Sequence, residues 1–154
     1  MSTPNMWNSL AALVLLAGSL GASGASPAGA ANSPEPGIRD AWARSTPAGA
    51  KYGAIYATFE SAAGDRLLGA SVPHSLAGAT QIHETVTSND GQMMMRQVAG
   101  VDLPTGQVVE FKPGGFHIML MNLKKPMKSG EHVNVTLTFK HAGQRTVVAT
   151  VRDE

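Results

Sequence analysis

Two histidines and five methionines stand within one short stretch of the chain. The stretch begins at His83 and contains a run of three methionines followed by a His-x-Met-x-Met pattern: Met93, Met94, Met95, His117, Met119 and Met121. The whole sequence of 154 residues has eight methionines and no cysteine. The side chains here that are able to bind a metal ion are therefore imidazoles and thioethers.

This set of side chains favours one kind of metal chemistry. The thioether sulfur of methionine is a soft, neutral donor that suits Cu(I), and imidazole is an acceptable partner for the same ion. Zinc would be expected to recruit cysteine, histidine or carboxylate. A blue-copper electron-transfer site needs a cysteine thiolate, and the sequence has none. The ligand set therefore predicts a Cu(I) site, argues against an electron-transfer protein and leaves copper carrying open.

Strand periodicity would bring these side chains together. If residues 116–121 form a strand, alternation places His117, Met119 and Met121 on one face and the apolar side chains on the other, which is the core side. By the same rule Met93 and Met95 share a face, with Met94 on the opposite one. His83 lies near the end of a preceding strand at residues 80–86. An Asp-Gly turn at residues 88–91 is expected to fold that strand back onto the methionines.

Two other interpretations of the same residues remain open. Methionine is a common core filler, so the chain could be a structural or adhesive β-sandwich with buried methionines, Met95 and Met119 among them. Alternatively His83 or His117 could be a general base oriented by Glu84 or Asp90. Alternation places Glu84 on the face opposite His83, and no nucleophile stands out. We therefore expect a protein that is not an enzyme.

The first 34 residues contain no charged side chain, and every charge lies from Glu35 onward. An apolar run at residues 10–20 is too short to span a bilayer comfortably, and small residues follow it up to Ala31. This layout predicts a signal peptide, or an uncleaved export segment, at residues 1–31. A linker at residues 32–37 then precedes one domain at residues 38–154. We expect a periplasmic or otherwise extracytoplasmic protein whose mature domain is not stably inserted in a membrane.

Short segments with alternating polarity predict an all-β domain. The expected strands are residues 38–44, 52–61, 66–72, 80–86, 93–96, 108–111, 116–121, 133–139 and 146–151. Close turn signals between them favour an antiparallel β-sandwich or Greek-key barrel. Leu67, Leu68 and Val72 look like core residues, while Met127 is expected to be a packing residue. His74, His132 and His141 fall at strand ends or turns and are expected on the surface.

The connecting segments carry two further expectations. Residues 100–106 contain Pro104 and are expected to form a loop, and the Lys112-Pro113-Gly114-Gly115 turn either positions His117 or is an ordinary hairpin connection. The basic loop at residues 124–130 could meet an acidic partner or simply be solvated. The net charge of +1 gives no electrostatic case for binding nucleic acid.

The chain resembles the periplasmic copper chaperones of the PCuAC type over nearly all of its exported part. The resemblance rests on Ala41-Trp42-Ala43-Arg44, Tyr56, Leu67-Leu68-Gly69-Ala70-Ser71, His83-Glu84-Thr85, the segment from Lys112 to Met121, and Leu137-Thr138-Phe139. It implies a cupredoxin-like β-sandwich. It also implies that copper is passed to the dinuclear copper centre of cytochrome c oxidase, on its subunit II, or to a thioredoxin-like Sco-type assembly protein.

The family signature is a His, ten residues, a Met, twenty-one residues and then His-x-Met. Here twenty-one residues separate Met95 from His117, and Arg96 follows Met95 as the family pattern requires. Eleven residues rather than ten separate His83 from Met95, so counting from His83 would instead choose Met94. A turn absorbs an extra residue more easily than a strand does. The resemblance therefore implies Cu(I) ligands at His83, Met95, His117 and Met119, with Met93 and Met121 as nearby sulfurs.

Overall fold

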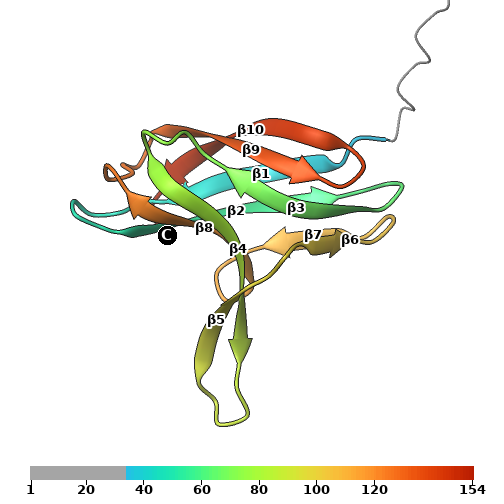
Figure 1. The fold of residues 1–154 in the computed structure, drawn as a ribbon, viewed down its shortest axis with the longest axis horizontal. Coiled ribbons are helices and arrows are strands. Elements are labelled where there is room, and N and C mark those ends of the chain that lie inside the picture. The colour runs from blue at the N-terminus through green and yellow to red at the C-terminus, as the bar shows by residue number, and fades with distance from the viewer. Residues whose placement is uncertain (1–33) are drawn as a thin grey trace, which may run out of the picture. The chain divides into compact units, whose positions relative to one another are not determined.

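A computed structural model of the chain describes residues 34–154. Ten strands follow one another in this part of the chain (Figure 1): β1 (Gly37–Arg44), β2 (Tyr52–Glu60), β3 (Asp65–Ser71), β4 (Ala77–Thr87), β5 (Met93–Gln97), β6 (Val101–Leu103), β7 (Val108–Phe111), β8 (Phe116–Leu123), β9 (His132–Phe139) and β10 (Gly143–Arg152). The predicted all-β class is confirmed. The export segment predicted at residues 1–31 lies outside the described residues. Nowhere in residues 34–154 does the chain form a helix long and apolar enough to cross a membrane.

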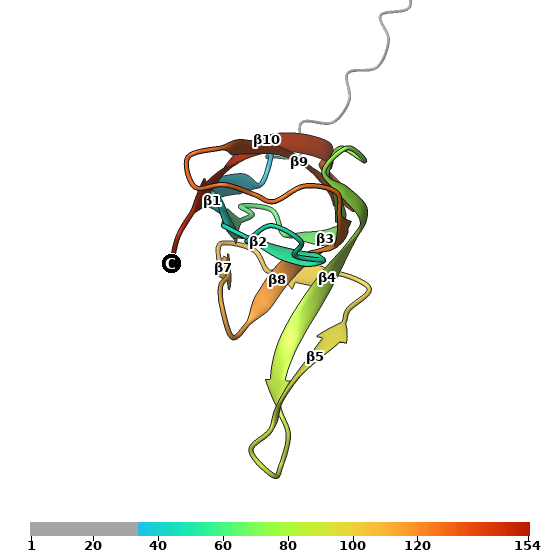
Figure 2. The ribbon, with the colours of Figure 1, turned by 90° about the vertical axis from the view of Figure 1, so that its left-hand side faces the viewer.

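The strands are hydrogen-bonded in the order β5-β4-β8-β7-β2-β1-β10-β9-β3-β6, and β8 also pairs directly with β2. Most pairings are antiparallel, as predicted, but β1 pairs with β10 and β7 with β8 in parallel. The sheet folds over on itself, so that β9 and β3 lie across from β2 and β8 (Figures 1 and 2). The result is the cupredoxin-like sandwich that the sequence resemblance implied.

The core lies between the two layers of the sandwich. Phe59 of β2 is at its centre, with its ring centroid 4.9 Å from that of Phe111 and 6.3 Å from that of Phe139. Ile118 and Leu120 of β8 are buried in the same cluster. Met127 is fully buried there as well, which confirms its prediction as a packing residue. Burial of these apolar side chains is the main force that stabilises the fold.

Two sequence expectations about the fold are wrong. Residues 100–106 were expected to form a loop, but they contain β6, which pairs with β3 through Asp65↔Leu103 and Leu67↔Val101. Leu68 was expected in the core, yet 44% of its surface is exposed. The reason is a register shift in β3 between Leu67 and Gly69 opposite β9. Such a bulge turns the extra residue away from the regular alternation.

The β4–β5 hairpin is the part of the fold that extends away from the sandwich. Figures 1 and 2 both show it projecting beyond the other strands. Its turn closes as predicted, since Gly91 N donates to the Ser88 carbonyl at 2.9 Å and Gly91 has a φ of 82°. Every residue of β5 is exposed. The three methionines of β5 are therefore presented on an edge strand that only β4 supports.

Candidate metal centre

The four predicted ligands lie on three neighbouring strands, β5, β4 and β8, and the pairing register puts them on one face of the sheet. His83 of β4 is directly opposite His117 of β8, and Gln81 is opposite Met119. On the other side of β4, Met95 of β5 is opposite Thr85. Because side chains alternate along a strand, all of these residues point to the same side. The predicted shared face is therefore confirmed.

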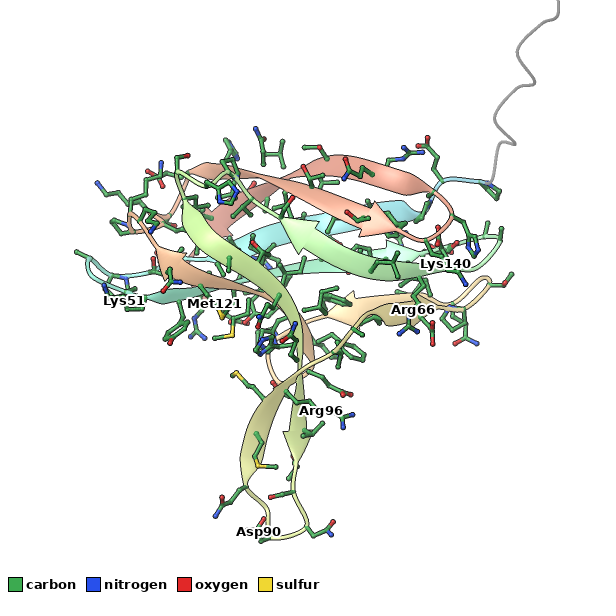
Figure 3. The ribbon with its side chains drawn as sticks, in the orientation of Figure 1. Lys51, Arg66, Asp90, Arg96, Met121 and Lys140 are labelled. Carbon is green, nitrogen blue, oxygen red and sulfur yellow. The ribbon has the colours of Figure 1, made fainter. Side chains whose placement is uncertain are left out.

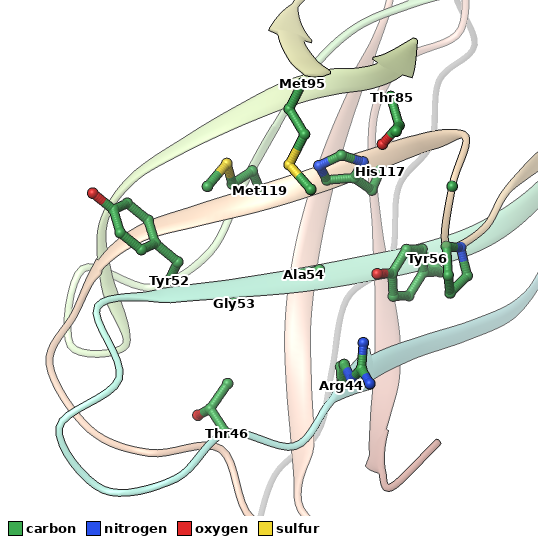
Figure 4. Close-up of a pocket in the computed structure, with 12 residues that line it drawn as sticks. Arg44, Thr46, Tyr52, Gly53, Ala54, Tyr56, Thr85, Met95, His117 and Met119 are labelled. Atoms are coloured by element: carbon green, nitrogen blue, oxygen red, sulfur yellow. The ribbon is translucent and has the colours of Figure 1, made fainter. Parts of the chain in front are cut away.

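The register also distinguishes the two neighbouring methionine candidates. Met94 pairs with Val86 and so points to the face on which Glu84 and Arg96 lie. Met95 points to the face of His83 and His117. Figure 4 shows the Met95 sulfur directed at the His117 ring, with Met119 beside it. The register therefore places Met95, but not Met94, on the face of His83, His117 and Met119. We refer to His83, Met95, His117 and Met119 as the cluster.

Hydrogen bonds decide which nitrogen of each imidazole ring carries the proton when the ring is neutral. His117 Nδ1 donates to the Gly115 carbonyl at 3.2 Å, and a carbonyl only accepts, so His117 Nε2 keeps its lone pair. The Thr85 N–H donates to the same carbonyl at 3.1 Å. The Lys112–Gly115 turn thus positions His117, since it supplies the oxygen that orients the ring.

His83 is held in the opposite tautomer. Its Nε2 donates to the side-chain oxygen of Gln81 at 2.9 Å, which leaves the lone pair on Nδ1. That Nδ1 is buried and has no hydrogen-bond partner among the described residues. Burial lowers the pKa of His83, and the charge that His117 gains on protonation lowers it further. His83 therefore stays neutral at pH values where an ordinary histidine begins to be protonated.

Exposure varies strongly within the cluster. His117 retains only 5% of its surface, whereas Met95 is 63% exposed. The strand pattern alone had predicted that this face is exposed. His117 is buried instead because β8 is a central strand and two rings flank it. The ring centroids of Tyr56 and His83 lie 6.5 Å and 5.8 Å from that of His117. The exposure of Met95 is the reverse of what a core-filling methionine requires. Met119 is half-buried.

Met95, His117 and Met119 share one groove of about 330 Å³. His83 does not line it, although His83 is directly opposite His117 on the adjacent strand. The sequence predictions did not include the remaining lining residues, which come from β1, β2, β4 and two loops: Arg44, Thr46, Tyr52, Gly53, Ala54, Tyr56, Thr85, Pro113 and Gly114 (Figure 4). The alternation of Tyr52, Ala54 and Tyr56 along β2 was the signal that could have identified this wall.

The carboxylates that an enzyme would need do not contact either histidine. Glu84 accepts hydrogen bonds from Arg96 Nε at 3.1 Å and Nη2 at 2.8 Å. Asp90 accepts from the Ser88 hydroxyl at the hairpin tip. Within residues 34–154 no three His, Cys, Asp or Glu side chains gather as a metal site. Any metal bound by this cluster must therefore accept thioether ligands.

The other candidate residues lie around or away from the cluster. Met121 is on the same face, opposite Tyr52 of β2 and Ala79 of β4. Met93 is on that face as well, further along the hairpin opposite Thr87. His74, His132 and His141 are exposed, as predicted. None of them is paired with a candidate ligand, whereas His83 is directly opposite His117, so these two of the five histidines belong to the cluster.

The chain matches a known family and a curated relative. The family described as "Putative lipoprotein LpqE-like" matches residues 37–151. The "Putative lipoprotein Lxx21020" of Leifsonia xyli subsp. xyli is 40% identical over 79 residues, which are 51% of this chain and 48% of that protein. The chain thus matches about half the length of this curated relative.

Three solved structures are similar over longer stretches. The copper-bound PCuAC domain from PmoF2 is 25% identical with a TM-score of 0.63, and the match covers 77% of this chain and 93% of that domain. Apo-DR1885 from Deinococcus radiodurans is 30% identical with a TM-score of 0.61 over 97% of both chains. Its Cu(I) form matches with a TM-score of 0.58 over 77% of both. The chain therefore belongs to the LpqE-like family and has the fold of the PCuAC domains.

Proposed function

We propose that this protein is a Cu(I)-binding metallochaperone and that His83, Met95, His117 and Met119 are its copper ligands. The observation that carries the proposal is the groove that Met95, His117 and Met119 share, with the His83 ring next to that of His117. Two imidazoles and two thioethers form a soft, neutral donor set that prefers Cu(I) to hard cations. The copper-bound forms of the PmoF2 domain and of DR1885 support copper as the metal.

The unequal exposure of the ligands supports reversible binding. His83 and His117 are held by hydrogen bonds on the sandwich, with the lone pairs of Nδ1 and Nε2 available. Met95 stands on the exposed hairpin edge, so its weak Cu–S bond is the one most open to an incoming ligand. Each exchange step forms one acceptor–copper bond and breaks one bond from copper to a thioether or, at the end, to an imidazole. Copper remains Cu(I) throughout, as a carrier that must release its cargo requires.

The cellular role follows from the family and remains part of the proposal. Residues 1–31 would act as the export signal, which agrees with the lipoprotein description of the family and of the Leifsonia relative. Outside the cytoplasm the protein would pass copper to a cuproprotein. The proposed acceptor is the dinuclear copper centre of cytochrome c oxidase or a Sco-type assembly protein. No catalytic step is needed for this role.

The test is an anaerobic titration in which the full chain competes for Cu(I) with a chromophoric chelator of known affinity. We expect stoichiometric withdrawal of Cu(I) from the chelator. Met119→Leu, which nearly conserves side-chain volume, should weaken the withdrawal without unfolding the protein. If the wild-type chain withdraws no copper, the chaperone function is wrong and the methionines have only structural roles.

A further inference from the structure

The groove beside the cluster is larger than a copper ion needs. Its volume is about 330 Å³, within the range of sites that accept organic groups. It runs from Met95 and His117 along β2 to Tyr52, which is exposed. Met121, directly opposite Tyr52, continues the row of thioethers on β8 in the same direction. The space next to the copper ligands can therefore admit side chains of another molecule.

Three lysines lie near Tyr52, in a depression separate from the groove. Lys51 precedes Tyr52, and its carbonyl accepts a hydrogen bond from Leu123 N at 3.1 Å, which brings the β1–β2 loop beside Lys124 and Lys125. These three exposed lysines line one shallow depression. Within residues 34–154 no carboxylate lies within 4.0 Å of any of their ammonium groups. Figure 3 shows Lys51 and Met121 at the same end of the sandwich. We refer to Lys51, Lys124 and Lys125 as the lysine patch.

A further cation lies in the groove itself because of a bulge in β1. The register shifts between Arg39 and Trp42, and Asp40 takes a positive φ of 51°. After this shift Trp42 is opposite Tyr56, so Arg44 two residues later points to the same face and lines the groove. Its Nη1 is 4.0 Å from a Glu154 carboxylate oxygen, and both side chains are about half exposed. A pair this long and this exposed adds little stability, so an incoming carboxylate can replace it.

None of the twelve residues that line the groove carries a carboxylate. Arg44 and the lysine patch therefore lie near the soft ligands, and no carboxylate inside the groove balances their positive charge. We propose that the molecule that receives copper from this protein is an acidic protein with thiolate ligands, and that it docks on the lysine patch with its thiolates in the groove. This inference rests on the proposed copper-carrier function and names the chemistry of the acceptor.

The exchange that follows docking conserves charge and electrons. A cysteine thiol of the acceptor releases its proton to solvent, and the thiolate sulfur forms a bond to Cu(I) as a thioether–copper bond breaks. Repetition of this step, followed by the breaking of the two imidazole–copper bonds, moves copper into the acceptor. After transfer, the methionines of the copper-free chaperone are neutral, as they were before, and copper is neither oxidised nor reduced. Thiolate is the stronger ligand for Cu(I), which drives the transfer toward the acceptor.

The experiment uses the Cu(I)-loaded full chain and two synthetic peptides. Both peptides have the same two cysteines, but one has flanking glutamates and the other flanking lysines. We expect transfer to the glutamate peptide to be at least about tenfold faster at low ionic strength, because opposite charges steer association. This difference should shrink as salt is added. Equal rates for the two peptides at low salt would overturn the inference.

Two Lys→Glu variants, which change the net charge of the protein by the same amount, test where the acidic partner docks. Lys51→Glu should slow transfer to the glutamate peptide several-fold, while Lys140→Glu, at the opposite end of the sandwich (Figure 3), should leave the rate nearly unchanged. Cu(I) affinity measured by chelator competition should be the same in both. Equal effects of the two variants would contradict docking at the lysine patch. A wild-type chain that fails to bind Cu(I) at all would instead overturn the copper-carrier function, and this inference with it.

Discussion

His83 and His117 lie opposite each other on adjacent strands, with ring centroids 5.8 Å apart, and they are fixed in opposite tautomers. Gln81 holds the Nε2–H of His83, and the Gly115 carbonyl holds the Nδ1–H of His117. Each ring therefore keeps one lone pair, on Nδ1 of His83 and on Nε2 of His117. Groups that orient the rings in this way contribute to metal affinity without touching the metal.

The first prediction concerns Gln81. Gln81→Leu removes the acceptor for His83 Nε2, so the ring is free to exchange tautomers. We expect Cu(I) affinity to fall about tenfold, the lower end of the effect of such supporting residues. Nitrogen NMR of the imidazoles should show the Nε2–H tautomer of His83 in the wild type and a mixture in the variant. Gln97→Leu is the control, since Gln97 is also opposite His83 but on β5.

The second prediction separates the two methionine candidates. Met95→Leu should weaken Cu(I) binding by at least about tenfold, whereas Met94→Leu, on the other face of β5, should have no effect on affinity. Both side chains are exposed, so both variants should change the free energy of unfolding by less than about 0.5 kcal/mol. Chelator competition and urea unfolding measure the two quantities. If only Met94→Leu weakened binding, the ligand register would be wrong by one residue.

The third prediction concerns stability and pH. Asp65 accepts hydrogen bonds from the backbone N–H groups of Arg66, His141 and Ala142 at 2.7, 2.9 and 3.0 Å. Burial raises the pKa of Asp65, but these hydrogen bonds outweigh burial and hold the pKa below its ordinary value of 3.8. The folded state then binds fewer protons than the unfolded chain. The stability that Asp65 contributes is fully present above pH 3.8. It is lost as the pH falls through the lower pKa that Asp65 has in the folded state.

Asp65→Asn should accordingly lower the free energy of unfolding by about 1–3 kcal/mol at neutral pH. The difference in the free energy of unfolding between Asp65→Asn and the wild type should become smaller in acid, because the wild-type carboxylate is then protonated. Urea unfolding across this pH range provides the measurement. Asp102→Asn is the matched control, because Asp102 is exposed and only pairs with Arg66, so its loss should change stability by less than about 1 kcal/mol. A constant deficit of Asp65→Asn at all pH values would show that its charge is not involved.

The fourth prediction contrasts two methionines of different environment. Met127 is fully buried, whereas Met93 is exposed on the hairpin. Met127→Ala should destabilise the protein by about 2–5 kcal/mol because it leaves a cavity. Met93→Ala should change stability by less than about 0.5 kcal/mol. Denaturant unfolding of the two variants compares them directly, and similar losses would contradict the assigned burial.

The sequence alone determined the type of chemistry and the local geometry of each half of the site. An alternation of two residues follows from strand geometry itself, so the shared face of His117 and Met119 and the separation of Met94 from Met95 were predictable. Asp90-Gly91 fixed the hairpin turn for the same local reason, since glycine tolerates the positive φ observed there. Eight methionines and no cysteine were enough to predict a preference for Cu(I).

Tertiary structure alone decided features that depend on partners distant in the sequence. Strand β6 exists because β3 pairs with it, and the burial of His117 follows from its place between β4 and β2. Leu68 and Arg44 take their directions from bulges in β3 and β1. A bulge shifts side-chain alternation by one residue and depends on the neighbouring strand. For this reason the strand pattern predicted which candidate ligands on a strand share a face, while the groove and its arginine emerged only from the folded sheet.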